Sequence, residues 1–368
     1  MNEKLKKIIY IVLGAFILLF LILFLVSSCS NKKDSLDTIE SNITTNTKNY
    51  YKNHKDELPK ENTVLSLSLQ SLIDKGIIKE FKKNVSCTGT MYIENNNDYY
   101  MYSPSIECKS DEKEFSTSNL KDTLLEKTVT SGNGLYNING SYYFRGDKVD
   151  NYIIFDGKLW RIIKINSDNS IRLIEAGRRD SIIWDDRYNS NTSSSNGIND
   201  YIHNDISSRI KDSLDEIYND KEGTIISNDA KGYIKNTSLC IGKRSLEDTS
   251  KDGSAECSVT LDNQYIGLLQ LNDYLTASLD NNCINTTSTA CSNYNYLADF
   301  PNLYWTLTAS TENTTQVYKI SKVVMASSAN SSGMARMVIN ISENSNVKGT
   351  GTEEDPYKVV GTSTEIKK

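Results

Sequence analysis

The strongest pattern along the chain is an uncharged, mostly apolar run from Ile8 to Val26, preceded by Lys4, Lys6 and Lys7. As a helix it spans about 28 Å, close to the hydrocarbon thickness of a bilayer. We therefore predict a membrane segment over residues 8–26. Positively charged residues favour the cytoplasmic side of a membrane segment, so the pattern predicts that the bulk of the chain is extracellular at the cell membrane.

The end of this run leaves two modes of attachment open. Val26-Ser27-Ser28-Cys29 resembles the lipobox of bacterial lipoproteins, in which small residues precede a cysteine that is lipidated. The run is longer than the apolar core of about 7 to 15 residues in a signal peptide, which favours a retained transmembrane helix instead. Either residues 8–26 or a lipidated Cys29 would keep the protein on the membrane.

Shorter periodic segments follow. Leu36, Ile39 and Ile43 recur at helical spacing, and the apolar positions between Ser66 and Phe81 predict a second helix. Between Cys87 and Cys108, two segments typical of strands flank a turn-rich centre, which predicts a β-hairpin whose ends a disulfide would join.

The remaining segments mostly predict strands. Residues 152–155 and 158–165 flank Asp156-Gly157, a pair suited to tight hairpin turns, and a third strand is expected over 171–174. Helical spacing of apolar residues predicts one amphipathic helix over 198–218. The resulting fold class is α+β, with an anchor or signal over 1–29, an extracellular helix-plus-hairpin domain over 30–130, a β-rich domain over 131–362 and a polar tail over 363–368.

Composition narrows the chemistry. The 368 residues suggest two or three folded units, and 22 Tyr, 8 Phe and 3 Trp supply apolar area for cores. The net charge is -6, and no dense basic stretch is present, so we predict no nucleic-acid partner. Two histidines leave little for metal ligation, so neither a metal nor a cofactor is predicted.

Cysteines support an exported location. The chain has 7 of them, and setting Cys29 aside leaves three local pairs: Cys87 with Cys108, Cys240 with Cys257, and Cys283 with Cys291. Six cysteines allow about 15 connectivities, so this pairing is a hypothesis. No C-x-x-C occurs, which favours disulfides over a zinc site.

Two regions carry resemblances. In the first region, the membrane helix leads into an extracellular helix with Tyr50-Tyr51, followed by Leu58-Pro-Lys60 and Leu67-Ser-Leu-Gln-Ser-Leu-Ile-Asp-Lys-Gly-Ile-Ile-Lys79. This order of segments resembles pseudopilin-like proteins of low-GC Gram-positive bacteria. The resemblance implies a pilin-like extracellular domain and, as an alternative function, a component of a pilus or secretion assembly. The processing motif Gly-Phe-Thr-Leu-Ile-Glu of true pilins is missing before the apolar run.

The second resemblance covers about 220 residues. This region contains, in order, Tyr143-Phe-Arg-Gly-Asp147, Leu159-Trp-Arg-Ile-Ile163, Tyr304-Trp-Thr-Leu307 and Gly349-Thr-Gly-Thr-Glu-Glu-Asp-Pro-Tyr357. These motifs, in this order, are similar to an uncharacterised exported domain of the same bacteria. The tryptophan-rich strand and the late arginine strand also look like the C-type-lectin-like fold of formylglycine-generating enzymes. Family members usually carry Arg-Pro where this chain has Arg336-Met337.

These features favour a non-enzymatic binding or adhesion module with a glycan or an envelope protein as ligand. Trp184, Asp185, Asp186 and Tyr188 are the ligand-binding candidates, because they combine groups that stack with groups that hydrogen-bond in one expected loop. His203 has no accompanying nucleophile motif, and no catalytic residue is predicted. An enzyme of the formylglycine-generating type would depend on a reactive pair such as Cys283 and Cys291, which instead sit in an expected disulfide-closed loop.

Overall fold

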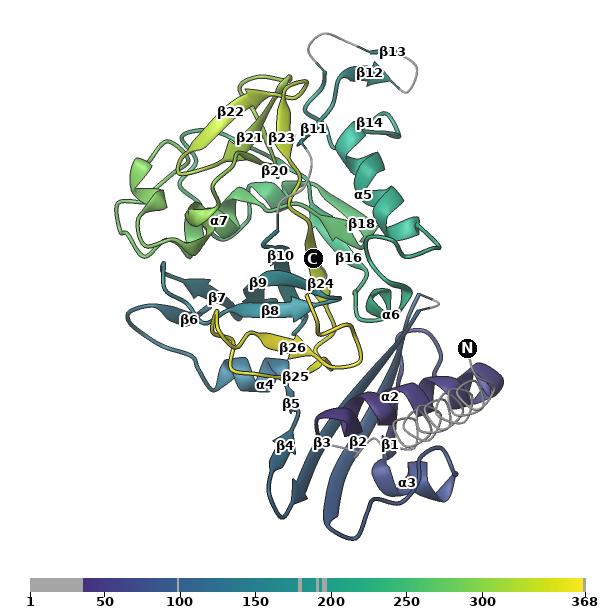
Figure 1. The fold of residues 1–368 in the computed structure, drawn as a ribbon. Helices are drawn as coiled ribbons and strands as arrows, with labels where there is room; N and C mark the ends of the chain where they lie inside the picture. The colour runs from purple at the N-terminus through teal and green to yellow at the C-terminus, as the bar shows by residue number, and fades with distance from the viewer. Residues whose placement is uncertain (1–35, 98, 178–180, 190–191, 194–196, 367–368) are drawn as a thin grey trace, which may run out of the picture. The chain divides into compact units, whose positions relative to one another are not determined.

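The computed structural model describes residues 36–97, 99–177, 181–189, 192–193 and 197–366 (Figure 1). The chain divides into two compact units, Met1–Ile39 and Glu40–Lys368. The predicted membrane segment 8–26 and Cys29 lie outside the described residues, and so does the end of the polar tail. Within the described ranges, no helix is long and apolar enough to cross a membrane. The mode of membrane attachment therefore stays a prediction.

The described structure is mixed α+β and mostly strands, which confirms the predicted fold class at this level. Its α-helices are α2 (Leu36–Asn53), α3 (Leu69–Asp74), α4 (Leu120–Leu125), α5 (Arg209–Asn219), α6 (Asn228–Lys231) and α7 (Leu271–Ala277). Short 3-10 turns are η1 (Lys55–Glu57), η2 (Glu256–Ser258), η3 (Thr289–Ser292) and η4 (Tyr296–Asp299).

The first sheet is four-stranded and antiparallel, in the order β1-β2-β3-β4. Its strands are β1 (Val64–Ser68), β2 (Val85–Asn96), β3 (Tyr99–Ser110) and β4 (Glu114–Ser116). The long β2–β3 hairpin places Cys87 directly opposite Cys108, and a disulfide joins them. This confirms the predicted disulfide-clipped hairpin.

The helix predicted over 66–81 is wrong in its first part. Leu65 and Leu67 alternate with polar residues in β1, which pairs with β2, and only the short α3 follows. Ser68 marks the change, because its hydroxyl accepts a hydrogen bond from the backbone N–H of Ser71 at 3.1 Å and caps α3. Pairing with a neighbouring strand overrode the local helical spacing.

The largest sheet has 10 strands, in the order β19-β24-β10-β9-β8-β26-β25-β5, with β7 also pairing β9 and β6 pairing β7. Its strands are β5 (Ser118–Asn119), β6 (Gly134–Ile138), β7 (Ser141–Arg145), β8 (Tyr152–Phe155), β9 (Lys158–Ile165), β10 (Ile171–Glu175), β19 (Ile266–Gly267), β24 (Val338–Ile341), β25 (Asn346–Lys348) and β26 (Tyr357–Val359). β8, β9 and β10 form the predicted meander. Asp156 and Gly157 turn with φ of 54° and 70°, as a tight hairpin requires.

A third sheet has six strands, in the order β11-β23-β20-β21-β22, with β17 also pairing β20. Its strands are β11 (Ser181–Ile183), β17 (Lys243–Arg244), β20 (Tyr304–Ser310), β21 (Gln316–Ile320), β22 (Val324–Ser328) and β23 (Ser332–Met334). Three two-stranded ribbons complete the strands: β12 (Arg187–Asn189) with β13 (Thr192–Ser193), β14 (Ile202–His203) with β15 (Ile206–Ser207), and β16 (Thr237–Cys240) with β18 (Thr260–Gln264).

One long helix over 198–218 is also a wrong prediction. The helix α5 begins only at Arg209, where the hydroxyl of Ser208 accepts from the backbone N–H of Lys211. The preceding residues form the β14–β15 ribbon, whose turn uses Asn204 and Asp205 at φ of 48° and 62°. These two residue types tolerate positive φ, so the turn interrupts the apparent helical pattern.

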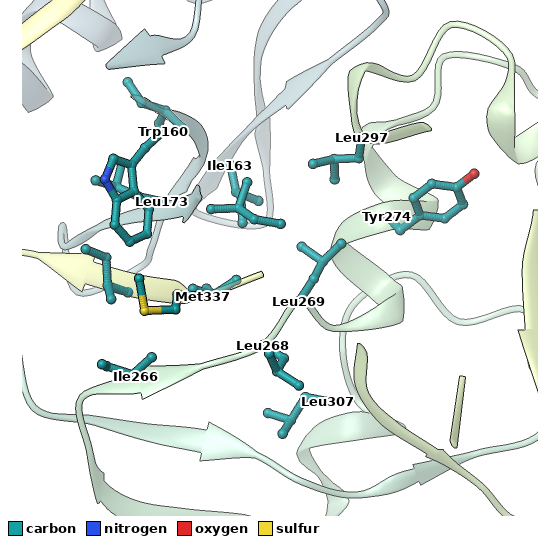
Figure 2. Close-up of a cluster of buried hydrophobic side chains, with 14 of the residues drawn as sticks. Trp160, Ile163, Leu173, Ile266, Leu268, Leu269, Tyr274, Leu297, Leu307 and Met337 are labelled. Atoms are coloured by element: carbon teal, nitrogen blue, oxygen red, sulfur yellow. The ribbon is translucent and has the colours of Figure 1, made fainter. Parts of the chain in front are cut away.

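A continuous apolar core joins the two larger sheets. Trp160, Ile163 and Leu173 come from the meander, Leu268 and Leu269 follow β19, and Leu307 comes from β20 (Figure 2). All five residues of β10 and all seven of β20 are buried, as expected of strands covered on both faces.

Polar contacts tie the β2–β3 hairpin to the rest of the unit that begins at Glu40. The Glu94 carboxylate accepts hydrogen bonds from Lys235 at 2.9 Å and from the Ser342 hydroxyl at 2.6 Å. The Tyr233 hydroxyl lies 2.7 Å from the carbonyl oxygens of both Tyr102 and Val360. In addition, β5 pairs with β25 of the large sheet, although it precedes the predicted domain boundary at residue 130.

Candidate functional site

The residues predicted to bind ligand lie where β11 leads toward α5. Trp184 is 0% exposed and packs beside Tyr201, with ring centroids 6.1 Å apart. Its carbonyl oxygen accepts a hydrogen bond from the backbone N–H of Ile210 at 3.0 Å, in the first turn of α5. The indole is therefore part of the core in this structure and presents no face to a ligand.

The neighbouring carboxylates support the same turn. Asp185 is buried and accepts hydrogen bonds from the backbone N–H groups of Arg187, Ile198 and Arg209. Burial raises the pKa of Asp185, while these hydrogen bonds and the Arg187 guanidinium oppose the rise. Asp186 is half-buried and pairs with Arg209 at 2.8 Å.

Tyr188 lies in β12, and its side chain is outside the described residues. The structure thus brings Trp184 and Asp185 together as buried support for α5.

A different aromatic residue is displayed to solvent. Tyr294 is 60% exposed, and no other aromatic side chain is exposed among the residues that the structure describes. It follows the Cys283–Cys291 disulfide in a loop rich in Asn, Ser and Thr. The sequence analysis identified the disulfide-closed loop but did not single out Tyr294, although an aromatic residue between Asn293 and Asn295, just after that loop, is a visible signal.

The backbone holds Tyr294 in an uncommon conformation. Its φ is 48°, in the left-handed region that bulky residues rarely adopt at a cost on the order of 1–3 kcal/mol. Its carbonyl oxygen accepts a hydrogen bond from the backbone N–H of Leu279 at 3.2 Å. On the next residue, the Asn295 amide donates to the carbonyl oxygens of Tyr274 and Cys291 at 2.9 and 2.7 Å. These contacts hold the backbone in place on both sides of the Tyr294 side chain.

Polar groups adjoin the ring in sequence and in the loop. The Asn293 amide donates to the Asp280 carboxylate at 2.8 Å, and the Ser278 hydroxyl donates to the Asn293 carbonyl oxygen at the same distance. The hydrogen bond from Asn293 holds the pKa of Asp280 below its usual value, so this carboxylate remains an acceptor. Asn281 and Asn282 are exposed beside it.

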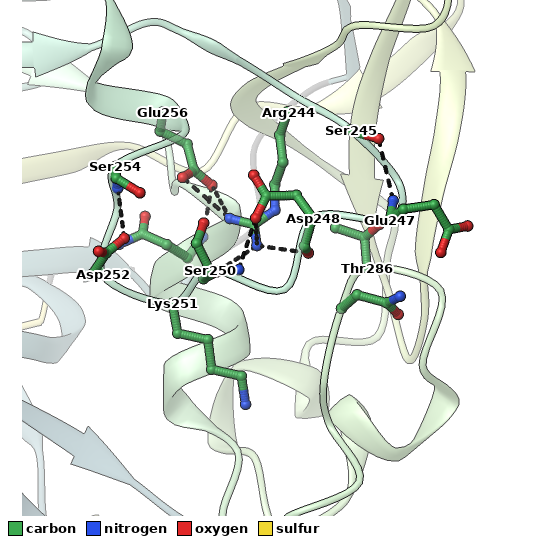
Figure 3. Close-up of polar contacts among 12 residues, drawn as sticks. Arg244, Ser245, Glu247, Asp248, Ser250, Lys251, Asp252, Ser254, Glu256 and Thr286 are labelled. Atoms are coloured by element: carbon green, nitrogen blue, oxygen red, sulfur yellow. Dashed lines mark hydrogen bonds and ion pairs between the residues drawn. The ribbon is translucent and has the colours of Figure 1, made fainter.

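A second disulfide loop, closed by Cys240–Cys257, is built around a buried ion pair (Figure 3). The side chains of Arg244 and Glu256 are both 0% exposed, and Arg244 Nη1 donates to the two carboxylate oxygens at 3.1 and 3.2 Å. Arg244 Nη2 donates to the carbonyl oxygens of Asp248 and Ser250. Burial raises the pKa of Glu256, and the Arg244 charge opposes that rise. One guanidinium therefore organises the loop over 245–256.

The two disulfide loops contact each other. Lys251 Nζ donates to the carbonyl oxygen of Cys283, and the Thr286 hydroxyl donates to the carbonyl oxygen of Leu246 at 3.0 Å. Glu312 adds a third support, because it accepts from the Ser245 hydroxyl at 2.7 Å and the Leu246 N–H at 3.0 Å. We call residues 245–256 and 278–294 the two-loop surface.

The Cys283–Cys291 disulfide bears on the chemistry of this surface. Cys283 and Cys291 are buried and joined to each other, so their thiols are not free in this structure. An exposed phenol ring in a loop that also carries amide and carboxylate groups can stack on the apolar face of a ligand, while those groups hydrogen-bond to its polar edge.

Comparisons of the chain with protein-family models, with curated proteins and with solved structures found no match. The pilin-like and C-type-lectin-like resemblances therefore stay predictions from sequence motifs.

Proposed function

We propose that this chain is a membrane-anchored extracellular protein that binds carbohydrate, without catalysis, through the two-loop surface. Attachment would use residues 8–26 or a lipidated Cys29, as the sequence predicts. The three disulfides support an oxidising, exported location, because such bonds persist mainly outside the cytosol.

The observation that carries the proposal is the display of Tyr294. A sugar ring offers an apolar C–H face that stacks on an aromatic ring and hydroxyl groups that pair with amides and carboxylates. Tyr294 is 60% exposed and held by its backbone, and Asp280, Asn281, Asn282 and Asn293 supply polar partners in the same loop. Hydrogen bonds of the Tyr294 carbonyl oxygen and of the Asn293 amide hold this part of the loop in place, so less conformational entropy is lost on binding than in an unconstrained loop.

The test is a glycan array probed with the full chain in a detergent that has no sugar head group, followed by titration of the glycans that bind. Tyr294→Ala should weaken binding about tenfold, because an aromatic contact contributes about 0.5–1.5 kcal/mol. Tyr294→Phe should retain most of the affinity, since it keeps the ring.

Two controls separate stacking from a general loss of apolar surface. Ile284 is 54% exposed in the same loop, and Val64 is 43% exposed on β1. Replacing Val64 by Ala should leave binding unchanged, and replacing Ile284 by Ala should weaken it less than Tyr294→Ala. If no glycan binds, or if Tyr294→Ala binds as the parent does, the proposal is wrong.

A further inference from the structure

A cleft lies within the unit that begins at Glu40, and it is lined by none of the residues of the two-loop surface. It is a cleft of about 460 Å³. Its lining includes Tyr92 and Ser105 of the β2–β3 hairpin, Lys121 and Asp122 of α4, and Glu343 and Asn346 around the start of β25. Every residue that lines it carries a polar side-chain group. Its volume falls within the range of about 300–1,000 Å³ that is typical of small-molecule sites.

The walls of this cleft are held by hydrogen bonds within the protein. Asn119 accepts from the backbone N–H of Asp122 at 3.1 Å and donates to the carbonyl oxygen of Glu343 at 2.8 Å. Asn346 donates through Nδ2 to the Ser103 hydroxyl at 3.0 Å. These amide contacts join the hairpin, α4 and the turn before β25, so the cleft is formed before any ligand arrives.

One wall residue has an unused acceptor. Asn346 is 1% exposed, and no group among the described residues donates a hydrogen bond to its Oδ1. The orientation of this amide is set by its Nδ2 contacts to the oxygen atoms of Ser103, so Oδ1 is the atom left without a partner. A buried acceptor without a donor costs on the order of the lost hydrogen bond, which a hydroxyl group supplied by a ligand would restore.

The charged residues that line the cleft indicate which class of ligand it can bind. Lys121 Nζ lies 3.6 Å from the Asp122 carboxylate, so these two charges offset each other. Glu343 is half-buried in the lining, and its carboxylate adds two acceptor oxygens and a negative charge to the cleft. Such a lining suits a ligand that donates several hydrogen bonds and carries no negative charge.

We infer that this cleft binds a neutral sugar or polyol through Glu343, Asn346 and the hydroxyl groups of Tyr92 and Ser105. The inference does not depend on the two-loop surface, which shares none of these residues. The probes are glucose, myo-inositol and glycerol, with glucose 6-phosphate as an anionic counterpart, measured by saturation-transfer NMR on the full chain in a detergent without a sugar head group.

At least one neutral probe should give a protein-dependent signal, and glucose 6-phosphate should give none because the Glu343 carboxylate repels it. Glu343→Gln should weaken binding about tenfold through the loss of a charge-assisted hydrogen bond. Ser105→Tyr should abolish it by filling the cleft. Glu112→Gln replaces an exposed carboxylate in the turn between β3 and β4 and is the matched control.

Tyr294→Ala distinguishes the two sites. Signals that survive Tyr294→Ala and disappear in Ser105→Tyr, with the melting temperature retained in Glu343→Gln, support the cleft. The inference is overturned if no neutral probe binds, if Glu343→Gln and Ser105→Tyr both bind as the parent does, or if Tyr294→Ala alone removes every signal.

Discussion

Replacing Arg244 by Met removes the cation at the centre of the loop over 245–256. The Glu256 carboxylate would then be buried at 0% exposure with only backbone N–H donors, among them that of Asn272 at 3.0 Å, and no cation beside it. Two carbonyl oxygens, those of Asp248 and Ser250, would also lose their donor. Breaking a buried ion pair from one side typically costs about 3–5 kcal/mol, and we expect the free energy of unfolding to fall by that amount.

The loss of stability caused by Arg244→Met should increase with pH. Burial already raises the pKa of Glu256 above its ordinary value of 4.5, and removing Arg244 raises it further. A carboxyl group whose pKa is raised on folding destabilises the folded state as pH increases, because the unfolded chain gives up the proton first. The variant should therefore lose more stability at about pH 8 than at about pH 5.

The assay is urea unfolding followed by tryptophan fluorescence, with the disulfides intact. Arg209→Met is the matched control, since the Arg209–Asp186 pair is partly exposed and should contribute only about 0.2–1 kcal/mol. Combining Arg244→Met with Glu256→Leu should restore much of the loss, because no buried charge is left unpaired. A loss no greater than that of Arg209→Met, or one that shrinks from pH 5 to pH 8, would refute the reasoning.

Three further changes test other parts of the structure. Replacing Cys283 and Cys291 by Ser should lower the free energy of unfolding by about 2.5 kcal/mol in urea, and an unchanged midpoint would contradict the role of this bond. Hydrogen bonds, first from the Ser310 hydroxyl, lower the pKa of Glu312 to about 2. Glu312→Gln should therefore destabilise the protein above about pH 4.5 and progressively less toward pH 2. A difference in the free energy of unfolding between parent and variant that does not change with pH would count against this. Burial lowers the pKa of Lys319 from 10.5 to about 8, so the stability of the parent protein should rise from about pH 8 to about pH 10.5. If the free energy of unfolding changes equally with pH in the parent and in Lys319→Met, Lys319 is not responsible.

Local sequence signals predicted the hairpins well. The Asp156-Gly157 turn and its flanking apolar runs specify the β8–β9 pair with little outside help, because both turn residues readily adopt positive φ. The spacing of Cys87 and Cys108 around one turn likewise anticipated a cross-strand disulfide. Reasoning from local signals failed over 198–218. The apolar residues there keep helical spacing, but the Asn204-Asp205 turn and the Ser208 cap place the start of the helix at Arg209.

The candidate site was less predictable because exposure depends on residues that are distant in the chain. Trp184 is followed by Asp185 and Asp186 and was expected in a ligand-binding loop, yet α5 and Tyr201 bury it. Tyr294 lies between Asn293 and Asn295, and its side chain stays 60% exposed. Both aromatic residues adjoin polar residues in sequence, and the packing of other elements decides which of them is buried.

By itself, the sequence determined the α+β class, the meander, the clipped hairpin and the three local cysteine pairs, all features that depend on short-range conformational preference or on covalent proximity. The tertiary structure alone decided that Arg244 would be buried against Glu256, that Trp184 would join the core and that Tyr294 would remain outside. The physical reason is that burial is a property of the assembled neighbours, which come from positions far apart in the chain.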